Sequence, residues 1–191
     1  MANIASVAYA IEGPQETLDI IKEAINKAVN AKDDKRYEEY ITCLNLGFTE
    51  EEIEKSRLGG LITEEAEIRD GALRFWTEER WGLQDFEELL MQKFPDIKVY
   101  WVVEESGMEI YCTNDKDGKY FPDRYWVDAC IDGEYQSEYF IQKKSAFQWL
   151  ANITQGRVKN SDELGIFNSD YEDSGTEDEN FIYIHEFEIV D

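Results

Sequence analysis

The sequence predicts an α+β fold, with a ferredoxin-like split βαβ core, an extended antiparallel sheet and helices packed on one face. Residues 4–11, 72–78 and 97–104 alternate apolar and polar side chains as strands do,. An amphipathic helical pattern follows the first of these strands and another precedes the last,. Because strands and helices are interspersed with tight turns, the helices are expected to cover one face of the sheet.

The first half of the chain begins with a strand over residues 4–11, and Gly13-Pro14 then opens a helix,. Thr49 and Glu52 have the spacing of a capping box, which predicts a short helix near residues 50–57,. Leu61–Arg69 carries three glutamates and is at best a solvated edge strand,. The stretch over about residues 31–70 is therefore interpreted as an insertion.

The second half predicts a helix over residues 82–94 and then several antiparallel strands. Asp132-Gly133 is a strong hairpin signal, and Ser145 with Gln148 predicts a second capping box at the start of a helix,. Residues 155–180 are polar, and we expect a mobile acidic loop over residues 170–180. The strands are expected at residues 72–78, 97–104, 108–113, 124–131, 135–142 and 181–190.

The predicted domain organisation is one α+β domain over residues 1–154 that contains the insertion. Residues 155–191 are expected to add the acidic loop and a C-terminal strand to the same domain. A chain of 191 residues is long enough to bury a substantial core,.

The composition is strongly acidic, with 43 Asp and Glu against 19 Lys and Arg and a net charge of −24. This disfavours nucleic-acid binding through a basic face. Surface scaling predicts about 9,400 Å² of exposed surface, or one net charge per about 390 Å², whereas duplex DNA carries one per about 107 Å². The acids would imitate DNA only if they gathered on one face, so the simpler interpretation is solubility.

The sequence predicts a cytoplasmic protein. No segment approaches the apolar length of a membrane span, and the start lacks the pattern of a signal peptide,. Cys43, Cys112 and Cys130 form no CxxC motif and suit a reducing compartment,. We expect no membrane association and no direct contact with nucleic acid.

Residues 73–121 resemble a known family. The segment Leu73-Arg-Phe-Trp-Thr-Glu-Glu-Arg-Trp81 precedes a helix that ends in Lys93-Phe94-Pro95, and Glu104-Glu-Ser-Gly107 and Asp117-Gly118 follow. This order resembles the YubB-type ferredoxin-like domains of plasmid, phage and bacterial proteins. The resemblance implies a fold and an origin in mobile elements, but no activity and no catalytic residues.

Candidate chemical sites all have structural explanations. His185 is the single histidine, and its strand is otherwise apolar and aromatic, so we expect a packed, hydrogen-bonded side chain,. Asp115-Lys-Asp117-Gly118 is interpreted as a turn rather than a calcium loop, and Cys112 and Cys130 as buried thiols,. The acid pairs Glu104-Glu105 and Asp123 with Asp128 are expected by chance among so many acids. We assign no catalytic, cofactor or metal residues and expect no cofactor.

Aromatic residues are concentrated in the predicted strands, and those on an outer sheet face could anchor a partner. Trp101 is predicted to point inward, whereas Trp126 lies opposite Tyr125, Val127, Ala129 and Ile131 in its strand. The candidate interaction surface is Trp126, Tyr111, Tyr100 and Phe140.

Three hypotheses for function stay open at this point. The leading one is a non-enzymatic protein-interaction module whose partner is an unidentified protein, with a basic surface as one option. The second is an acidic inhibitor that imitates nucleic acid, and the third is a carboxylate- or metal-dependent enzyme. The oligomeric state is not predicted.

Overall fold

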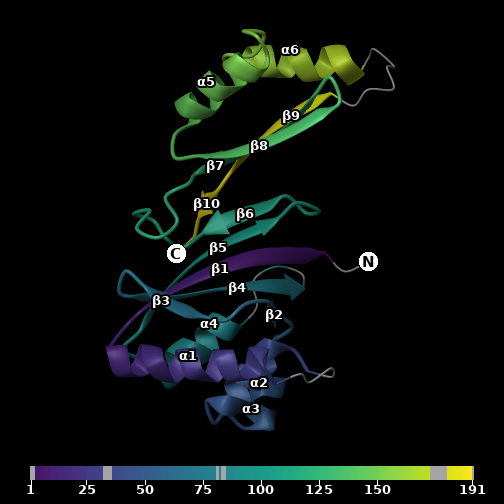
Figure 1. Cartoon of the computed structure of the whole chain (residues 1–191). Coiled ribbons are helices and arrows are strands. Elements are labelled where there is room, and N and C mark those ends of the chain that lie inside the picture. Colours follow the sequence, from purple (N-terminus) through teal and green to yellow (C-terminus); the bar gives the residue numbers. More distant parts are fainter. Residues whose placement is uncertain (1–2, 32–35, 81, 83–84, 173–179, 191) are drawn as a thin grey trace. The chain divides into compact units, whose positions relative to one another are not determined.

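The computed structural model describes residues 3–31, 36–80, 82, 85–172 and 180–190 (Figure 1). Its contacts group into two compact units, which we call unit 1 (Met1–Lys116 with Val190–Asp191) and unit 2 (Asp117–Ile189). Each unit combines a sheet with helices, so the predicted α+β class is confirmed. A single domain over residues 1–154 is not tested by this grouping and stays a prediction.

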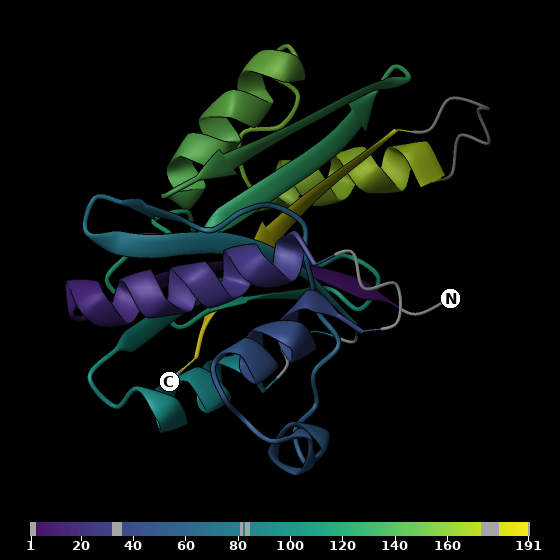
Figure 2. The same ribbon diagram turned by 60° about the horizontal axis from the view of Figure 1, so that its bottom comes forward.

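Unit 1 contains an antiparallel sheet with four helices on one of its faces (Figures 1 and 2). The strands are β1 (Ile4–Glu12), β2 (Leu61–Ile62), β3 (Glu67–Arg69), β4 (Ala72–Arg80), β5 (Lys98–Glu105) and β6 (Ile110–Thr113). The helices are α1 (Gln15–Val29), α2 (Glu38–Asn45), α3 (Glu50–Glu54) and α4 (Phe86–Lys93).

Strand β1 lies in the middle of this sheet, in the order β6-β5-β1-β4-β2. It pairs antiparallel with both β4 and β5, and β4 pairs antiparallel with β2 and β3. Strands β4 and β5, which α4 connects, therefore run parallel with β1 between them. In the same way β1 and β2 run parallel on either side of β4.

The core of unit 1 lies between the sheet and its helices. Tyr9 of β1 stacks on Phe75 of β4 with 4.8 Å between ring centroids, and Phe86 of α4 packs edge-on against both. Trp101 is only 6% exposed, which confirms the prediction that it belongs to the core. The amphipathic stripe of α1 is buried against this layer through Leu18, Ile21, Ala24, Ile25 and Ala28.

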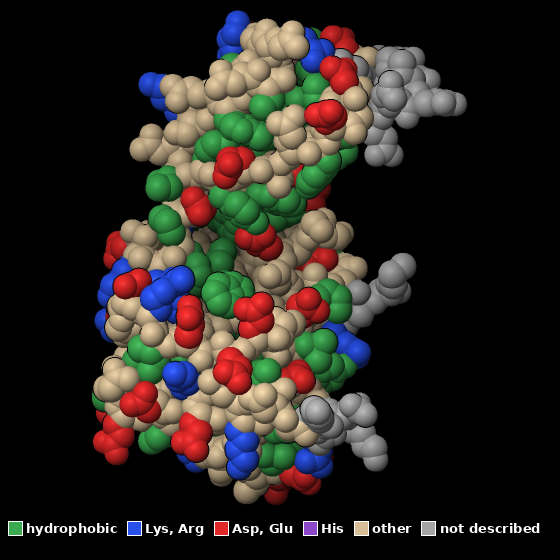
Figure 3. All heavy atoms as spheres, viewed as in Figure 1, with side chains coloured by type: hydrophobic (Ala, Val, Ile, Leu, Met, Phe, Trp, Pro, Cys, Tyr) green, Lys and Arg blue, Asp and Glu red, His purple; other side chains and the backbone are tan. Residues whose placement is uncertain are grey.

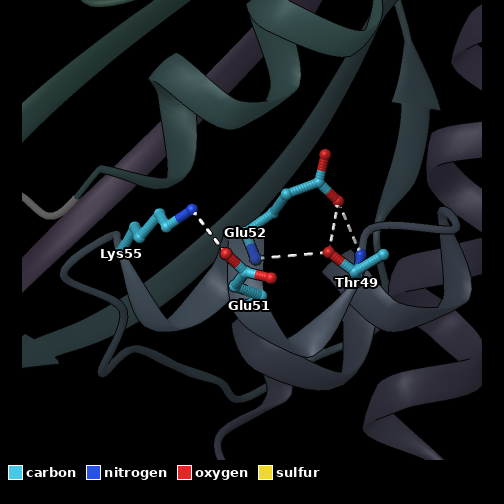
Figure 4. Close-up of polar contacts among 4 residues, drawn as sticks. All are labelled: Thr49, Glu51, Glu52 and Lys55. Atoms are coloured by element: carbon cyan, nitrogen blue, oxygen red, sulfur yellow. Dashed lines mark hydrogen bonds and ion pairs between the residues drawn. The ribbon is translucent and has the colours of Figure 1, made fainter.

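The stretch over residues 31–70 contains more structure than the sequence indicated. The predicted capping box is present: Thr49 N–H donates to the Glu52 carboxylate at 2.8 Å, and Glu52 N–H donates to Thr49 Oγ1 at 3.3 Å (Figure 4). On the next turn, Lys55 pairs with Glu51 at 2.9 Å. Helix α2 was not predicted, and β2 and β3 are short strands that both pair with β4.

Unit 2 has a sheet of its own, so the expectation of one extended sheet is wrong. Its three antiparallel strands are β7 (Tyr125–Ile131), β8 (Glu134–Phe140) and β9 (Phe181–Glu186), in the order β8-β7-β9. Helices α5 (Lys143–Ile153) and α6 (Ser161–Glu172) pack on one face through Leu150, Val158 and Phe167. After β9 comes β10 (Glu188–Ile189). Val190 and Thr113 both belong to unit 1, where Val190 N–H donates to the Thr113 carbonyl.

Two predictions for this unit need correction. Helix α6 was not predicted within the polar stretch over residues 155–180, and its end overlaps the loop expected over residues 170–180. Its first turn is capped by Asn160, since the Asn160 side chain accepts the N–H of Glu163 at 3.0 Å. Helix α5 begins at Lys143, and no side chain caps it, so the predicted box at Ser145 does not form. The central part of the expected mobile loop, residues 173–179, lies outside the described residues.

Candidate functional site

Strand β7 presents two different faces. Val127, Ala129 and Ile131 are buried against the helices of unit 2. Trp126 and Asp128 alternate with them and therefore point to the opposite face of the sheet,. The helix-free face of this sheet is the candidate functional site.

Cross-strand pairing builds this face from three rows. Trp126 lies opposite Tyr139 on β8 and His185 on β9, and the two following rows are centred on Asp128 and Cys130. We call the result the aromatic face. Its members are Trp126, Asp128, Cys130, Tyr135, Ser137, Tyr139, Phe181, Tyr183 and His185.

The six rings of the aromatic face form a continuous arc around Asp128. Trp126 stacks between Tyr139 and His185, with centroid distances of 6.2 Å and 5.0 Å. From His185 the arc continues to Tyr183 at 6.1 Å, then to Phe181 at 5.3 Å and to Tyr135 at 6.5 Å. Rings held on three paired strands lose little freedom on binding, so this surface is preorganised.

Three tyrosines give the aromatic face its exposed surface. Tyr135 is 59% exposed, Tyr183 51% and Tyr139 41%. Figure 3 shows hydrophobic side chains gathered over the strands of unit 2, with acidic side chains among them. Exposed aromatic side chains concentrated on one face are unusual for a surface that stays in water, and they mark interaction sites.

A polar pair lies at the centre of the arc. Nε2 of His185 is 2.9 Å from Oδ1 of Asp128, and both side chains are mostly buried. The histidine is therefore packed and hydrogen-bonded, as the sequence predicted. Its partner comes from a strand more than fifty residues away, which sequence reasoning did not find.

Among the Asp, Glu, Lys and Arg residues, the three strands contain only acids. Asp128, Glu134, Glu138 and Glu186 lie on β7, β8 and β9, which contain no Lys or Arg. The pKa of the Tyr135 hydroxyl is raised by burial and, to a lesser extent, by the negative charge of Asp128. The strands that carry the aromatic face are therefore acidic, and Asp128 is the one of these four acids that points to the face itself.

The residues predicted as an interaction surface do not lie together. Trp126 is on the aromatic face but half-buried, whereas Phe140 is on the helix side, where it packs on Trp149 at 5.8 Å. Tyr100 and Tyr111 belong to the sheet of unit 1, and Tyr111 is only 6% exposed. Sequence reasoning missed the three exposed tyrosines as a group, although the alternation within β8 and β9 places them on one face.

The aromatic face does not have the arrangement of a catalytic triad. In such a triad the histidine lies between the nucleophile and the carboxylate, because it must take the proton of the nucleophile. Here Ser137 lies directly opposite Asp128, and His185 is on the far strand. The carboxylate therefore separates the hydroxyl from the imidazole, and this order does not activate Ser137.

Unit 1 contains a second cluster, a buried carboxyl pair formed by Glu39 of α2 and Glu79 of β4. Tyr9 and Thr77 each donate a hydroxyl to the same oxygen of Glu79 at 2.7 Å, and Gly60 N–H donates to Glu39 at 2.9 Å. Burial, followed by the charge of Glu79, raises the pKa of Glu39 well above its usual range. Because both carboxyls have no exposed surface, no substrate reaches them.

Among the other predicted acids, Glu105 has a structural role. The buried carboxylate of Glu105 accepts the N–H groups of Gly107 at 3.0 Å and Met108 at 2.6 Å, which closes the β5–β6 turn. The side chain of Asn114 bonds to the backbone of Trp101 and Val99. Among the described residues no group of three or more His, Cys, Asp or Glu side chains could hold a metal ion.

The chain was compared with family models, curated proteins and solved structures, and none of them matches it. Within the described part of the chain, no helix is both long and apolar enough to cross a membrane.

Proposed function

We propose that this protein is a non-enzymatic interaction module that binds another protein through the aromatic face of unit 2. The observation that carries the proposal is the arc of six rings with Tyr135, Tyr139 and Tyr183 exposed. Tyrosine and tryptophan dominate binding energy at protein interfaces, because they bury a large area at a small entropic cost. Rings that already contact one another are also held in place before the partner arrives.

We further propose that the protein acts in the cytoplasm. Its three cysteines are free, which suits a reducing compartment,. The thiol of Cys43 is protected further, because burial and the charge of Glu39 raise its pKa to about 12.

We also propose that unit 1 is a ferredoxin-like domain related to the YubB-type family. Two features support this assignment: the antiparallel order β5-β1-β4-β2 and the helices α1 and α4 on one face. Each of the two parallel strand pairs is split by an antiparallel strand, which is the defining pattern of this fold. The family has no activity to carry over, so the functional proposal depends on unit 2 alone.

The proposal is tested by selecting ligands from a displayed library of random peptides with the full-length protein. Tyr135→Ala and Tyr183→Ala are each expected to weaken the selected peptides by about 2 kcal/mol, or about 30-fold in Kd. Trp76→Ala is the matched control, since Trp76 is a 42% exposed aromatic residue on β4 of unit 1. Trp126 is less suitable because its half-buried ring supports Tyr139 and His185.

Isothermal titration calorimetry measures the affinities, and circular dichroism checks that each variant is folded. Equal affinity of the two tyrosine variants and the unmodified protein would overturn the proposal. If reversing the charge of acidic residues abolishes peptide binding while the tyrosine substitutions have no effect, the result would favour the acidic inhibitor that imitates nucleic acid.

A further inference from the structure

We propose that the partner binds as an extended basic segment that adds a fourth strand along the outer edge of β8. This inference rests on the proposed function and specifies the chemistry of the partner. It follows from a difference between the two edges of the unit 2 sheet: a side chain blocks the β9 edge, and no strand pairs with the outer edge of β8 in the described part of the chain.

The β9 edge is closed by a side chain. The amide of Asn168 on α6 donates to the Ile182 carbonyl at 2.8 Å and accepts the Ile182 N–H at 3.1 Å. One asparagine thus makes both hydrogen bonds that a neighbouring strand would make to Ile182. An incoming strand would have to displace this amide, so β9 is protected against pairing.

The β8 edge is open at Tyr135 and Ser137, whereas the N–H of Tyr139 donates to the side chain of Glu138 at 3.1 Å. Asp132 and Gly133 both have positive φ, of 53° and 80°, as a two-residue type I′ hairpin requires,. Such a turn makes Ile131 and Glu134 a hydrogen-bonded pair, so the N–H and C=O groups of Tyr135 and Ser137 point away from β7,. In the described part of the chain no strand pairs with this side of β8.

Strand β8 also lacks several of the usual protections of an edge. It is seven residues long, contains no Lys and no Pro, and pairs with β7 without a bulge,. Its side chains are exposed apart from Gln136 and Phe140, which are half-buried. What β8 carries instead is negative charge, in Glu134 and Glu138.

That charge identifies the kind of segment that fits. In an added strand, alternate residues lie beside Tyr135 and Tyr139 on the aromatic face, and the others lie beside Glu134 and Glu138 on the opposite face. Apolar residues suit the first set and Lys or Arg the second, since oppositely charged cross-strand neighbours are favourable. A second copy of this chain is disfavoured, because it would bring the same glutamates and a net charge of −24,.

The test uses a synthetic peptide of about nine residues with alternating Arg and Val, a length that spans β8. We expect it to bind at least tenfold more tightly than the matching peptide with Glu in place of Arg. Methylation of alternate backbone nitrogens in the Arg peptide should reduce affinity at least tenfold, because it removes main-chain donors and leaves the charge unchanged.

Ser137→Pro is the matching change in the protein. The backbone nitrogen of Ser137 faces outward, so proline at this position keeps the pairing with β7 but removes an N–H donor from the open edge. Ser137→Pro should weaken the Arg peptide at least tenfold, whereas Ser137→Ala should leave the affinity within twofold. If Ser137→Pro lowers the melting temperature strongly, the comparison of methylated and unmethylated peptides decides.

Three results would overturn the inference. The methylated peptide could bind as tightly as the unmethylated one, the Glu peptide could bind as tightly as the Arg peptide, or sedimentation could show a dimer that Ser137→Pro abolishes. The proposed function fails separately, since it depends on the effect of Tyr183→Ala on library peptides. Tyr183 lies on β9, two strands away from the β8 edge.

Discussion

Replacing Glu39 by glutamine should change how the stability of this protein depends on pH. Glu39 and Glu79 are both fully buried, and burial is the main reason why the pKa of Glu39 is raised; the charge of Glu79 adds to it. Glutamine has the size of a protonated glutamate and keeps an oxygen that can accept the N–H of Gly60,. It cannot ionise, so the variant removes the titration while preserving most of the packing.

Proton linkage gives the direction in which the free energy of unfolding changes with pH. Because the pKa of Glu39 is higher in the folded protein than in the unfolded chain, the folded state holds a proton that the unfolded state releases. The stabilisation is fully present below the unfolded pKa of about 4.5 and is lost as pH rises through the folded pKa. Over that interval the free energy of unfolding of the unmodified protein falls by up to about 1.4 kcal/mol per pH unit relative to Glu39→Gln.

Urea denaturation between pH 5 and 9 at constant ionic strength measures this difference. Glu87→Gln is the matched control, because burial raises the pKa of Glu87 to about 7. Its difference from the unmodified protein should level off above about pH 7, whereas that of Glu39→Gln should grow until the pH passes the raised pKa of Glu39,.

A constant difference between Glu39→Gln and the unmodified protein across this range would refute the reasoning. It would mean that the pKa of Glu39 is not raised in the folded state. If the variant does not fold, the infrared band of a protonated carboxyl group can be followed in Glu87→Gln, which keeps Glu39 and removes the other raised glutamate; that band must persist above the ordinary pKa of a carboxyl group.

Three further predictions concern stability. Gly60→Ala should lower the free energy of unfolding, measured by urea denaturation, by about 1–3 kcal/mol, because a Cβ at residue 60 would collide with the Glu39 carboxyl,. Gly59 has open space around it, so Gly59→Ala should be tolerated. Trp101→Ala should lower the free energy of unfolding by about 3–5 kcal/mol, and Trp76→Ala by much less, because Trp76 is exposed,. Equal losses of stability would place Trp101 outside the core. The melting temperature should rise from low salt to a few hundred millimolar NaCl, because salt screens the repulsion of 24 net charges, and a fall would show that favourable ion pairs dominate,.

Most of the regular elements could be predicted because their signals are local. The alternation in β1, the capping box at Thr49 and the Asp132-Gly133 turn each depend on neighbouring residues only. Helix α2 could not be found in this way, because it buries Glu39 and Thr42 where an amphipathic helix normally buries apolar residues,. Helix α6 has a weak apolar stripe, and its clearest signal is the spacing of Asn160 and Glu163,.

The candidate site could be predicted only in part, for a related reason. Alternation within one strand shows that Trp126 opposes Val127, but it does not show which strands become neighbours. The aromatic face requires β9 to pair with β7 across more than fifty residues, which brings His185 beside Trp126. Without that pairing, Tyr100 and Phe140 were equally plausible members of the surface, and they lie elsewhere.

The acidic composition has a physical use in a protein with an exposed aromatic face. An exposed aromatic sheet with an open edge is a surface on which copies of a protein tend to associate. Glu134 and Glu138 on that edge, together with the net charge of −24, oppose association between copies and attract a basic segment to the same place,. The excess of acids therefore needs no resemblance to nucleic acid to explain it. On this reasoning, removing the two glutamates should reduce both solubility and selectivity more than removing two acids from α1 does, because the change in net charge is the same and only the position differs.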